Sequence, residues 1–175
     1  MLSRSLGEGA ELRALEPWQA GEFSRYVDGA RSHLAPWLPW ATSIMDEESA
    51  RAFLQRYADR QAADEGRIYG IWLDGTLVGG TLFRTFDTAS GVCELGVWLA
   101  PEAQGRGLIT RAARHLIDWA FRVRGLVRVE WCCSVDNQPS IAVARRLGMT
   151  REGVLRSAFL VNDVRQDVEV WALLA

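Results

Sequence analysis

The chain has 175 residues, of which 49% are hydrophobic, and its 20 basic and 22 acidic residues give a formal net charge of −2 at pH 7. This length favours one domain with its own core, and the balanced charge argues against a general nucleic-acid binder. All 20 basic residues are arginine, which excludes a Schiff-base lysine, a P-loop lysine and a lysine general base. The sequence has no uncharged apolar run of the roughly 18 residues that a membrane span needs, so no membrane partner is expected.

The cysteines and histidines limit the metal and nucleophile chemistry. Cys93, Cys132 and Cys133 lie in apolar stretches without CxxC spacing, which favours reduced, buried thiols in a cytoplasmic protein over a disulfide framework or a zinc site. The two histidines are His33 and His115, too few for a His-rich metal site or an easily built Ser-His-Asp triad. No metal is expected.

The periodicity of apolar residues predicts the element order β-α-α-β-β-β-α-β-α-β-β. The expected strands are 11–15, 67–74, 76–87, 92–99, 126–133, 149–160 and 165–174, and the expected helices are about 17–31, 46–65, 107–124 and 137–147. The stretch 33–40, HLAPWLPW, carries two prolines and is predicted to be irregular. This order implies a mixed α/β sheet with helices on its faces. We expect a single domain over 1–175, with about 1–9 as a flexible N-terminal extension.

A glycine-containing turn, residues 101–110 (PEAQGRGLIT), directly follows an expected strand and opens an expected helix. Glycines let the backbone approach a ligand, and a helix N-terminus offers unpaired N–H donors with a partial positive charge. Arg106 adds a full charge. The turn is therefore suited to a phosphate or pyrophosphate, with a plain strand-to-helix connection as the alternative.

These residues resemble a known family. Gln104–Ile109 resembles the Q/R-x-x-G-x-G/A motif of the GNAT acyltransferases, with Ile109 where Gly or Ala is usual, and Gly107–Thr110 resembles the RimJ/RimL-like branch of ribosomal-protein N-terminal acetyltransferases. Three further segments agree with that branch: Trp37–Trp40, 137–149 and 152–174.

The resemblance implies a GNAT-type α/β (α+β) fold, with a mixed, mostly antiparallel seven-stranded sheet, helices on both faces and a central splay between two parallel strands, here 92–99 and 126–133. It implies a cytoplasmic, bacterial-like acyltransferase that moves an acetyl group from acetyl-CoA to a primary amine by direct attack in a ternary complex. The acceptor it implies is a protein or peptide N-terminal α-amine, and a homodimer is compatible with it. Two alternatives stay open: a small-amine acetyltransferase for an antibiotic or polyamine, with 46–48 (Asp-Glu-Glu) as an acidic funnel, and a non-catalytic acyl-CoA-binding module.

The resemblance also assigns roles to residues. Those assigned to CoA are Val97, Trp98, Leu99, Gln104, Gly105, Arg106, Gly107, Leu108, Ile109, Thr110, Asn137 and Arg145. Ser140 is assigned as donor to the departing CoA sulfur, and capping of the following helix is the alternative for both Ser140 and Asn137.

The remaining candidates concern the acceptor amine. Alternation places Glu94 on the same strand face as Gly96 and Trp98, where its carboxylate could take a proton through water or pair structurally with an arginine. His33, Trp37 and Trp40 are the candidate acceptor contacts, since aromatic side chains suit flexible peptides and cations. Phe159 stands close to where some members of the branch carry a glutamate, so the family's base is not evident here.

Overall fold

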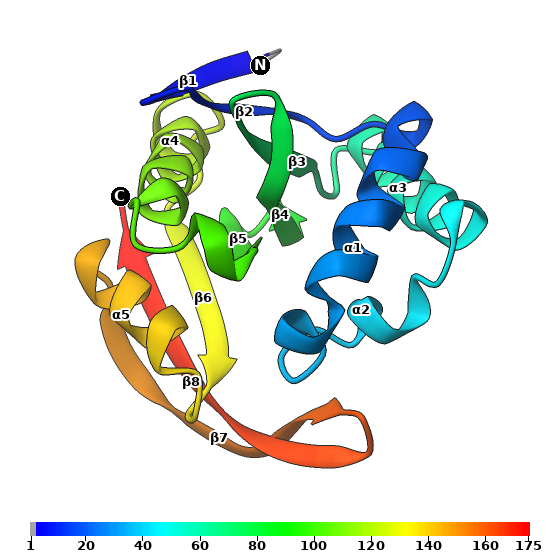
Figure 1. The fold of residues 1–175 in the computed structure, drawn as a ribbon. Helices are drawn as coiled ribbons and strands as arrows, with labels where there is room; N and C mark the ends of the chain where they lie inside the picture. Colours follow the sequence, from blue (N-terminus) through cyan, green and yellow to red (C-terminus); the bar gives the residue numbers. More distant parts are fainter. Residues whose placement is uncertain (1–2) are drawn as a thin grey trace.

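The structure, a computed structural model that describes residues 3–175, is built on one eight-stranded sheet (Figure 1). The strand order across the sheet is β1-β2-β3-β4-β5-β6-β8-β7; β5 and β6 are parallel, and the other neighbours are antiparallel. The bounds are β1 Ser3–Gly7, β2 Ala10–Ala14, β3 Ile68–Leu73, β4 Thr76–Asp87, β5 Val92–Leu99, β6 Arg128–Ser134, β7 Thr150–Val161 and β8 Val164–Leu174. The predicted mixed, mostly antiparallel sheet is confirmed.

The prediction of seven strands was wrong by one. Residues 3–7, assigned to a flexible extension, form β1 and pair with β2. The turn between them holds Glu8 and Gly9, both with positive φ (54° and 76°), which is the two-residue hairpin geometry that suits strand twist. Leu6 is buried in the core, so this strand has its own hydrophobic anchor. Residues 1–2 of the expected extension lie outside the described residues.

Five α-helices in the described chain cover both faces of the sheet: α1 Ala20–Leu34, α2 Trp40–Ser43, α3 Glu47–Ala62, α4 Leu108–Arg122 and α5 Gln138–Arg146. α4 and α5 lie on one side of the sheet, and α1, α2 and α3 lie on the other (Figure 1). The buried side chains of each group form a separate hydrophobic cluster with the sheet. The alternation expected along β5 is confirmed, because Cys93 and Leu95 belong to the first cluster and Trp98 to the second. α1 extends to Leu34, so His33 is helical and the irregular segment is shorter than predicted. Between residues 3 and 175, none of the helices has the length and apolar character to cross a membrane.

The parallel strands β5 and β6 diverge. They pair at Val92 with Arg128, at Cys93 with Val129 and at Glu94 with Glu130, and the recorded pairing ends there. β5 continues along β4, and β6 continues along β8. The predicted central splay is therefore confirmed, and it opens immediately after Glu94.

The β7–β8 hairpin reaches past the sheet toward the segment between α1 and α2 (Figure 1). Asn162 Nδ2 donates to the Ala35 carbonyl at 3.0 Å, and Gln166 Nε2 donates to the Pro36 carbonyl at 3.2 Å. The register of β7 shifts between Leu155 and Phe159. The hairpin thus holds β7 side chains over the opening of the splay.

Candidate active site

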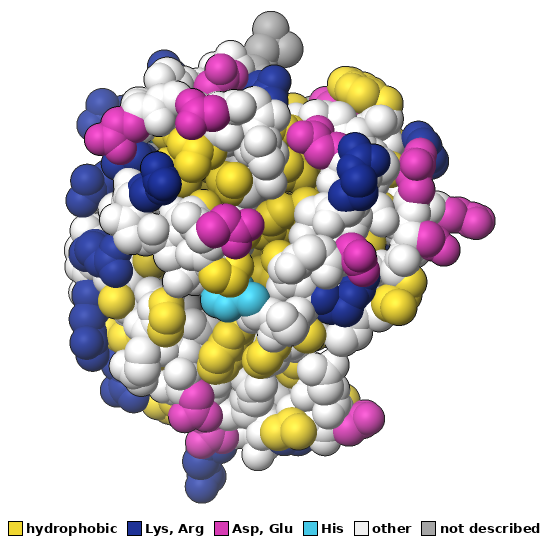
Figure 2. All heavy atoms as spheres, in the orientation of Figure 1, with side chains coloured by type: hydrophobic (Ala, Val, Ile, Leu, Met, Phe, Trp, Pro, Cys, Tyr) yellow, Lys and Arg dark blue, Asp and Glu magenta, His cyan; other side chains and the backbone are white. Residues whose placement is uncertain are grey.

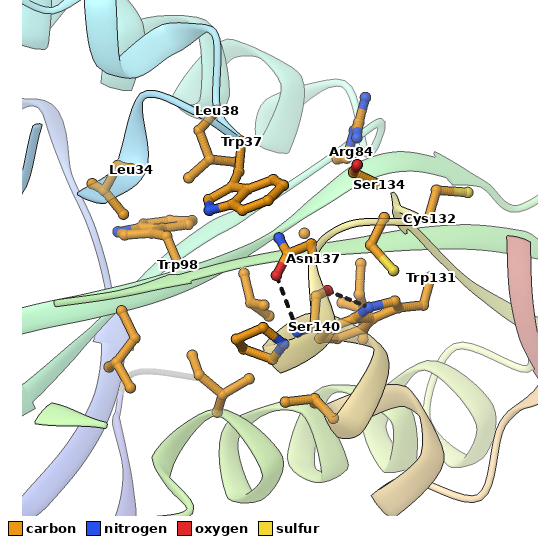
Figure 3. A pocket seen from close by; sticks show the side chains of 18 of the residues that line it. Leu34, Trp37, Leu38, Arg84, Trp98, Trp131, Cys132, Ser134, Asn137 and Ser140 are labelled. Atoms are coloured by element: carbon orange, nitrogen blue, oxygen red, sulfur yellow. Dashed lines mark hydrogen bonds between the residues drawn. The ribbon is translucent and has the colours of Figure 1, made fainter. Parts of the chain in front are cut away.

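A cavity of about 740 Å³ follows the splay between β5 and β6. One end is lined by His33, Gln104, Gly105 and Gly107, the middle by Val97, Ser134, Asn137 and Ser140, and the other end by Tyr57, Arg84, Glu94, Cys132 and Phe159. Figure 3 shows Ser140 and Asn137 on the α5 side facing Trp37 and Trp98 across this space, and Figure 2 shows hydrophobic side chains gathered along the hollow in the middle of the molecule.

The N-terminus of α4 forms the floor of the first end. Gly105 and Gly107 have positive φ (77° and 68°), and Gly107 is the N-cap residue without a side-chain cap. By contrast, Asp46 caps α3 and Asn137 caps α5. The first N–H groups of α4 are therefore left for an anionic ligand.

Thr110 adds a second sign of a ligand at this end. Thr110 is 8% exposed and lines the cavity, and its Oγ1 has no hydrogen-bond partner among residues 3–175. Buried polar atoms are usually paired. The uncapped helix and the unpartnered hydroxyl together fit a bound pyrophosphate arm.

His33 and Gln104 meet over the same end. Gln104 Nε2 lies 3.1 Å from His33 Nε2, so a neutral His33 protonated on Nδ1 accepts this hydrogen bond. The sequence assigned Gln104 to CoA and His33 to the acceptor. The structure brings the two side chains together at the α4 end, away from Glu94 and Arg84.

Asn137 and Ser140 lie in the middle of the cavity and make different contacts at the start of α5. Asn137 Oδ1 accepts the backbone N–H of Ser140 at 3.2 Å, so Asn137 is the helix cap. The Ser140 hydroxyl takes no part in capping. Its Oγ accepts the indole Nε1–H of Trp131 at 2.9 Å (Figure 3), and Trp131 is almost fully buried. Trp131 was missed from sequence, although alternation along β6 places it on the same strand face as Cys133.

Glu94 lies at the point where the splay opens. Burial raises the pKa of Glu94; the nearby Arg84 guanidinium partly offsets this, Glu130 adds to the rise, and a hydrogen bond with Cys132 lowers the pKa. Arg84 Nη1 lies 3.4 Å from Glu94 Oε1. Arg84 is the extra residue where the β4–β5 register shifts between Phe83 and Thr85, and such bulges re-aim a side chain. A carboxyl group with a raised pKa, in a cavity, has the properties of a general base.

The three thiols are poor nucleophiles. Burial raises the pKa of Cys93 and of Cys132 to about 12, with Glu130 contributing at Cys93 and Glu94 at Cys132. Burial also raises the pKa of Cys133, which the Ser140 hydroxyl partly offsets. Since the thiolate is the reactive form, neutral pH leaves all three thiols protonated.

The other predicted site residues divide into two groups. Trp37, Trp40, Trp98, Leu99, Leu108 and Ile109 line the cavity. Arg106 and Arg145 are exposed and lie outside the lining; Arg145 sits over the Trp171 ring, and the neighbouring Arg146 lines the cavity instead.

The acidic segment 46–48 also lies outside the cavity lining. Asp46 caps α3 by accepting from the Ser49 N–H, and Glu47 pairs with Arg51 at 2.7 Å. The candidate acidic funnel is thus part of a helix start. Sequence reasoning did not place Tyr57, Arg84 or Phe159 at the far end. Tyr57 comes from α3, the β4 bulge brings Arg84, and the β7–β8 hairpin brings Phe159. Within residues 3–175, His, Cys, Asp and Glu side chains form no group of three or more that could hold a metal ion.

Comparisons with known proteins agree with this geometry. The family model "Acetyltransferase (GNAT) domain" matches residues 11–150. The putative ribosomal N-acetyltransferase YdaF of Bacillus subtilis (strain 168) is 31% identical, over 99% of this chain and 96% of the relative. The ribosomal-protein-serine acetyltransferase of Escherichia coli (strain K12) is 28% identical, over 95% of this chain and 93% of the relative. A solved structure of RimL, ribosomal L7/L12 alpha-N-protein acetyltransferase, in complex with coenzyme A, aligns with a TM-score of 0.91 and 26% identity, over 97% of this chain and 96% of that one.

The chain therefore belongs to the GNAT acetyltransferases. The predicted GNAT fold, the N-acetyltransferase class and the likeness to the RimJ/RimL-like branch are confirmed.

Proposed function

We propose that this GNAT enzyme moves the acetyl group of acetyl-CoA to a primary amine in the cytoplasm, with the N-terminal α-amine of a protein or peptide as its preferred acceptor. The observation that carries the proposal is the cavity that connects the uncapped N-terminus of α4 to the partly buried carboxyl group of Glu94 through the splay. In this cavity a thioester and an amine can lie next to each other between β5 and β6. The names of YdaF and of the E. coli relative, and the coenzyme A bound to RimL, support the same reading.

Acetyl-CoA fits the α4 half of the cavity. The N–H groups at the start of α4 would hold the pyrophosphate, and Gly105 and Gly107 would let it approach the backbone. Beyond Glu94, the edge of β5 that faces β6 pairs with no other strand of the described chain. The pantetheine arm would pair along that edge from Leu99 to Val97, which brings the thioester toward Ser140.

The chain's own residues supply three functions at the reacting atoms. The amine nitrogen attacks the thioester carbonyl carbon, and a backbone N–H near Val97 would stabilise the oxyanion. Glu94 would take the amine proton through water. Ser140 would give a hydrogen bond or proton to the leaving sulfur as the carbon–sulfur bond breaks.

Acceptor basicity favours an α-amine. An α-amino group has a pKa of roughly 7.7–8.0, whereas a lysine side chain has one of about 10.4. At pH 8, roughly half of the α-amines are neutral but only about one lysine side chain in 250. A carboxylate that acts through water is therefore a sufficient base for an α-amine and a poor one for a lysine side chain.

Two peptides of equal length test this proposal, one with a free N-terminus and no lysine, the other N-terminally blocked with a single lysine. We expect acetyl-CoA-dependent thiol release and a mass gain at the free N-terminus, with turnover of the lysine peptide lower by at least about tenfold. Thiol release with the lysine peptide alone, or with a small amine and neither peptide, would contradict the proposal.

A further inference from the structure

The Glu94 end of the cavity carries an excess of positive charge. Glu94 is the one aspartate or glutamate among the cavity-lining residues of the described chain. Arg84 lines the same end, and three guanidinium groups, of Arg56, Arg60 and Arg84, act on the Tyr57 hydroxyl. Arg84 shares the cavity lining with Glu94, whereas Arg56 and Arg60 lie beside Tyr57, outside the lining.

Arg84 contacts Glu94 and is also positioned to contact a ligand in the cavity. The bulge in β4 directs it into the cavity, its guanidinium carbon lies 5.4 Å from the centre of the Phe159 ring, and its Nη1 is 3.4 Å from Glu94. A guanidinium has five N–H donors in a planar fork. The single contact to Glu94 leaves most of that fork available beside the proposed amine site.

Arg56 and Arg60, which lie on α3 near Tyr57, extend this positive region. The Arg60 guanidinium lies 5.2 Å from the centre of the Tyr57 ring and donates to the carbonyls of Glu65 and Arg84. In the described chain, neither Arg56 nor Arg60 has an ion-pair partner within 4.0 Å. Burial raises the pKa of Tyr57 in spite of the arginines, so its hydroxyl stays a hydrogen-bond donor.

We propose that the acceptor is an anionic peptide N-terminus, with an aspartate or glutamate among its first three residues whose carboxylate binds between Arg84 and Tyr57 while the α-amine lies at Glu94. This inference rests on the proposed N-terminal acetyltransferase function and adds the chemistry of the acceptor. Carboxylates form short, charge-assisted hydrogen bonds with guanidinium groups. Because one residue spans at most about 3.6 Å, an acidic side chain near the N-terminus stays within reach of Arg84.

The same charges disfavour a polyamine. A cationic acceptor would place ammonium groups against Arg84, Arg56 and Arg60 with Glu94 as the one carboxylate of the lining. Like charges brought together at a binding site select against the wrong partner. The acidic segment 46–48 is outside the cavity lining.

Binding measurements test the inference without any chemistry. Three peptides that begin Ala-Glu-Glu, Ala-Gln-Gln and Ala-Lys-Lys, and otherwise share one sequence, are titrated calorimetrically into the CoA-bound enzyme at low salt. We expect the acidic peptide to bind at least about tenfold more tightly than the neutral one and the basic peptide to bind most weakly, with the difference shrinking as salt screens the charges. Equal affinity for all three, or a preference for the basic peptide or for spermidine, would overturn the inference.

A matched pair of variants assigns the preference to this end of the cavity. Arg56→Gln should reduce the acidic-over-neutral affinity ratio by about two- to fivefold at low salt. Arg51→Gln removes an exposed arginine from the same helix, but one that pairs with Glu47, and should leave the ratio unchanged. If both variants leave it unchanged, or both lower it equally, the arginines around Tyr57 do not select the acceptor.

Thiol release with the same peptides separates the two proposals. Turnover of the neutral and acidic peptides at equal kcat/KM would refute the anionic acceptor and leave the N-terminal acetyltransferase in place. Preferential binding of the acidic peptide with no turnover of any peptide would support the anionic site and refute the proposed function.

Discussion

The indole Nε1–H of Trp131 donates to Ser140 Oγ at 2.9 Å, and this contact fixes the hydroxyl at the centre of the cavity. A hydroxyl has one proton to donate and two lone pairs to accept with. Because the indole occupies a lone pair, this contact does not use the hydroxyl proton, which can be donated to the neighbouring Cys133 sulfur or to the leaving sulfur of CoA. Trp131 is thus a positioning residue for the proposed donor.

Replacing Trp131 by phenylalanine removes this donor and keeps an aromatic ring. Trp131→Phe should lower kcat by about three- to tenfold, which is what one neutral hydrogen bond is worth, and should leave the KM for acetyl-CoA nearly unchanged. Trp171→Phe is the control, since Trp171 is also buried, pairs with Trp131 across β6 and β8, and donates its indole N–H to Glu169. An equal loss of kcat in both variants would point to packing alone.

Ser140→Ala should lower kcat by between about tenfold and 100-fold with little change in acetyl-CoA affinity, because the lost contact matters most in the transition state. The variant also leaves the Trp131 N–H buried without a partner, which costs about 1–3 kcal/mol of folding stability. In the Trp131→Phe background the stability loss should disappear while the kcat loss persists. A lower melting temperature with unchanged kcat would mean that the hydroxyl serves only the indole.

Replacing Cys93, Cys132 and Cys133 together by alanine should preserve most of the turnover, because their raised pKa values keep the thiols protonated at neutral pH. Mass spectrometry of the wild-type enzyme after rapid quenching should show no acetylated cysteine. A trapped acetyl-cysteine, together with loss of turnover in the variant, would replace direct attack by a covalent mechanism.

The α4 turn tests the acetyl-CoA site. Gly107→Ala puts a Cβ on a residue with φ of 68°, at a strain of roughly 1–2 kcal/mol. It should weaken acetyl-CoA binding by at least about tenfold, because the backbone can no longer approach the pyrophosphate. Gly125→Ala carries the same strain, with φ also 68° and open space around the added Cβ, and lies outside the cavity lining. Calorimetric affinity that falls equally in both variants would show that strain alone is responsible.

Local sequence patterns predicted the features that depend on local structure. The strand–turn–helix at 101–110 and the alternation that turns Glu94 away from Cys93 follow from backbone periodicity, and both appear in the structure. The contacts made by Arg84, Phe159 and Trp131 could not be predicted in this way. They depend on a bulge in β4, on the register shift in β7 and on how α5 packs against β6.

Side-chain direction on a helix is equally hard to predict. The resemblance assigned Arg145 to the cofactor, and in the structure the neighbouring Arg146 lines the cavity; one step along a helix rotates a side chain by about 100°. The sequence predicted seven strands, and the structure has an eighth at residues 3–7. This segment is too short to show a clear period, and it becomes a strand by pairing with β2. Pairing with β2, which the sequence pattern does not show, determines that residues 3–7 form a strand.

Glu94→Gln tests the proposed base through two pH dependences. Burial raises the pKa of Glu94, so the wild-type carboxylate should gain its proton at a pH above the usual value of about 4.3. Below that raised pKa, kcat/KM in the wild type should fall more steeply than protonation of the acceptor amine alone explains. The variant should be slower by about tenfold to 100-fold at neutral pH and follow the amine titration only.

The pH dependence of stability is a second, independent test of the raised pKa of Glu94. A carboxyl group whose pKa is raised by folding stabilises the protein below its unfolded-state pKa, and that contribution is lost as the pH rises through its folded-state pKa. The melting temperature of Glu94→Gln should therefore exceed that of the wild type by an amount that grows between about pH 4 and neutrality. A difference that stays constant with pH would mean that Glu94 is not held in a site that disfavours its charge. If wild-type activity falls more steeply at low pH but the melting-temperature difference does not grow with pH, the loss of activity at low pH arises from another residue.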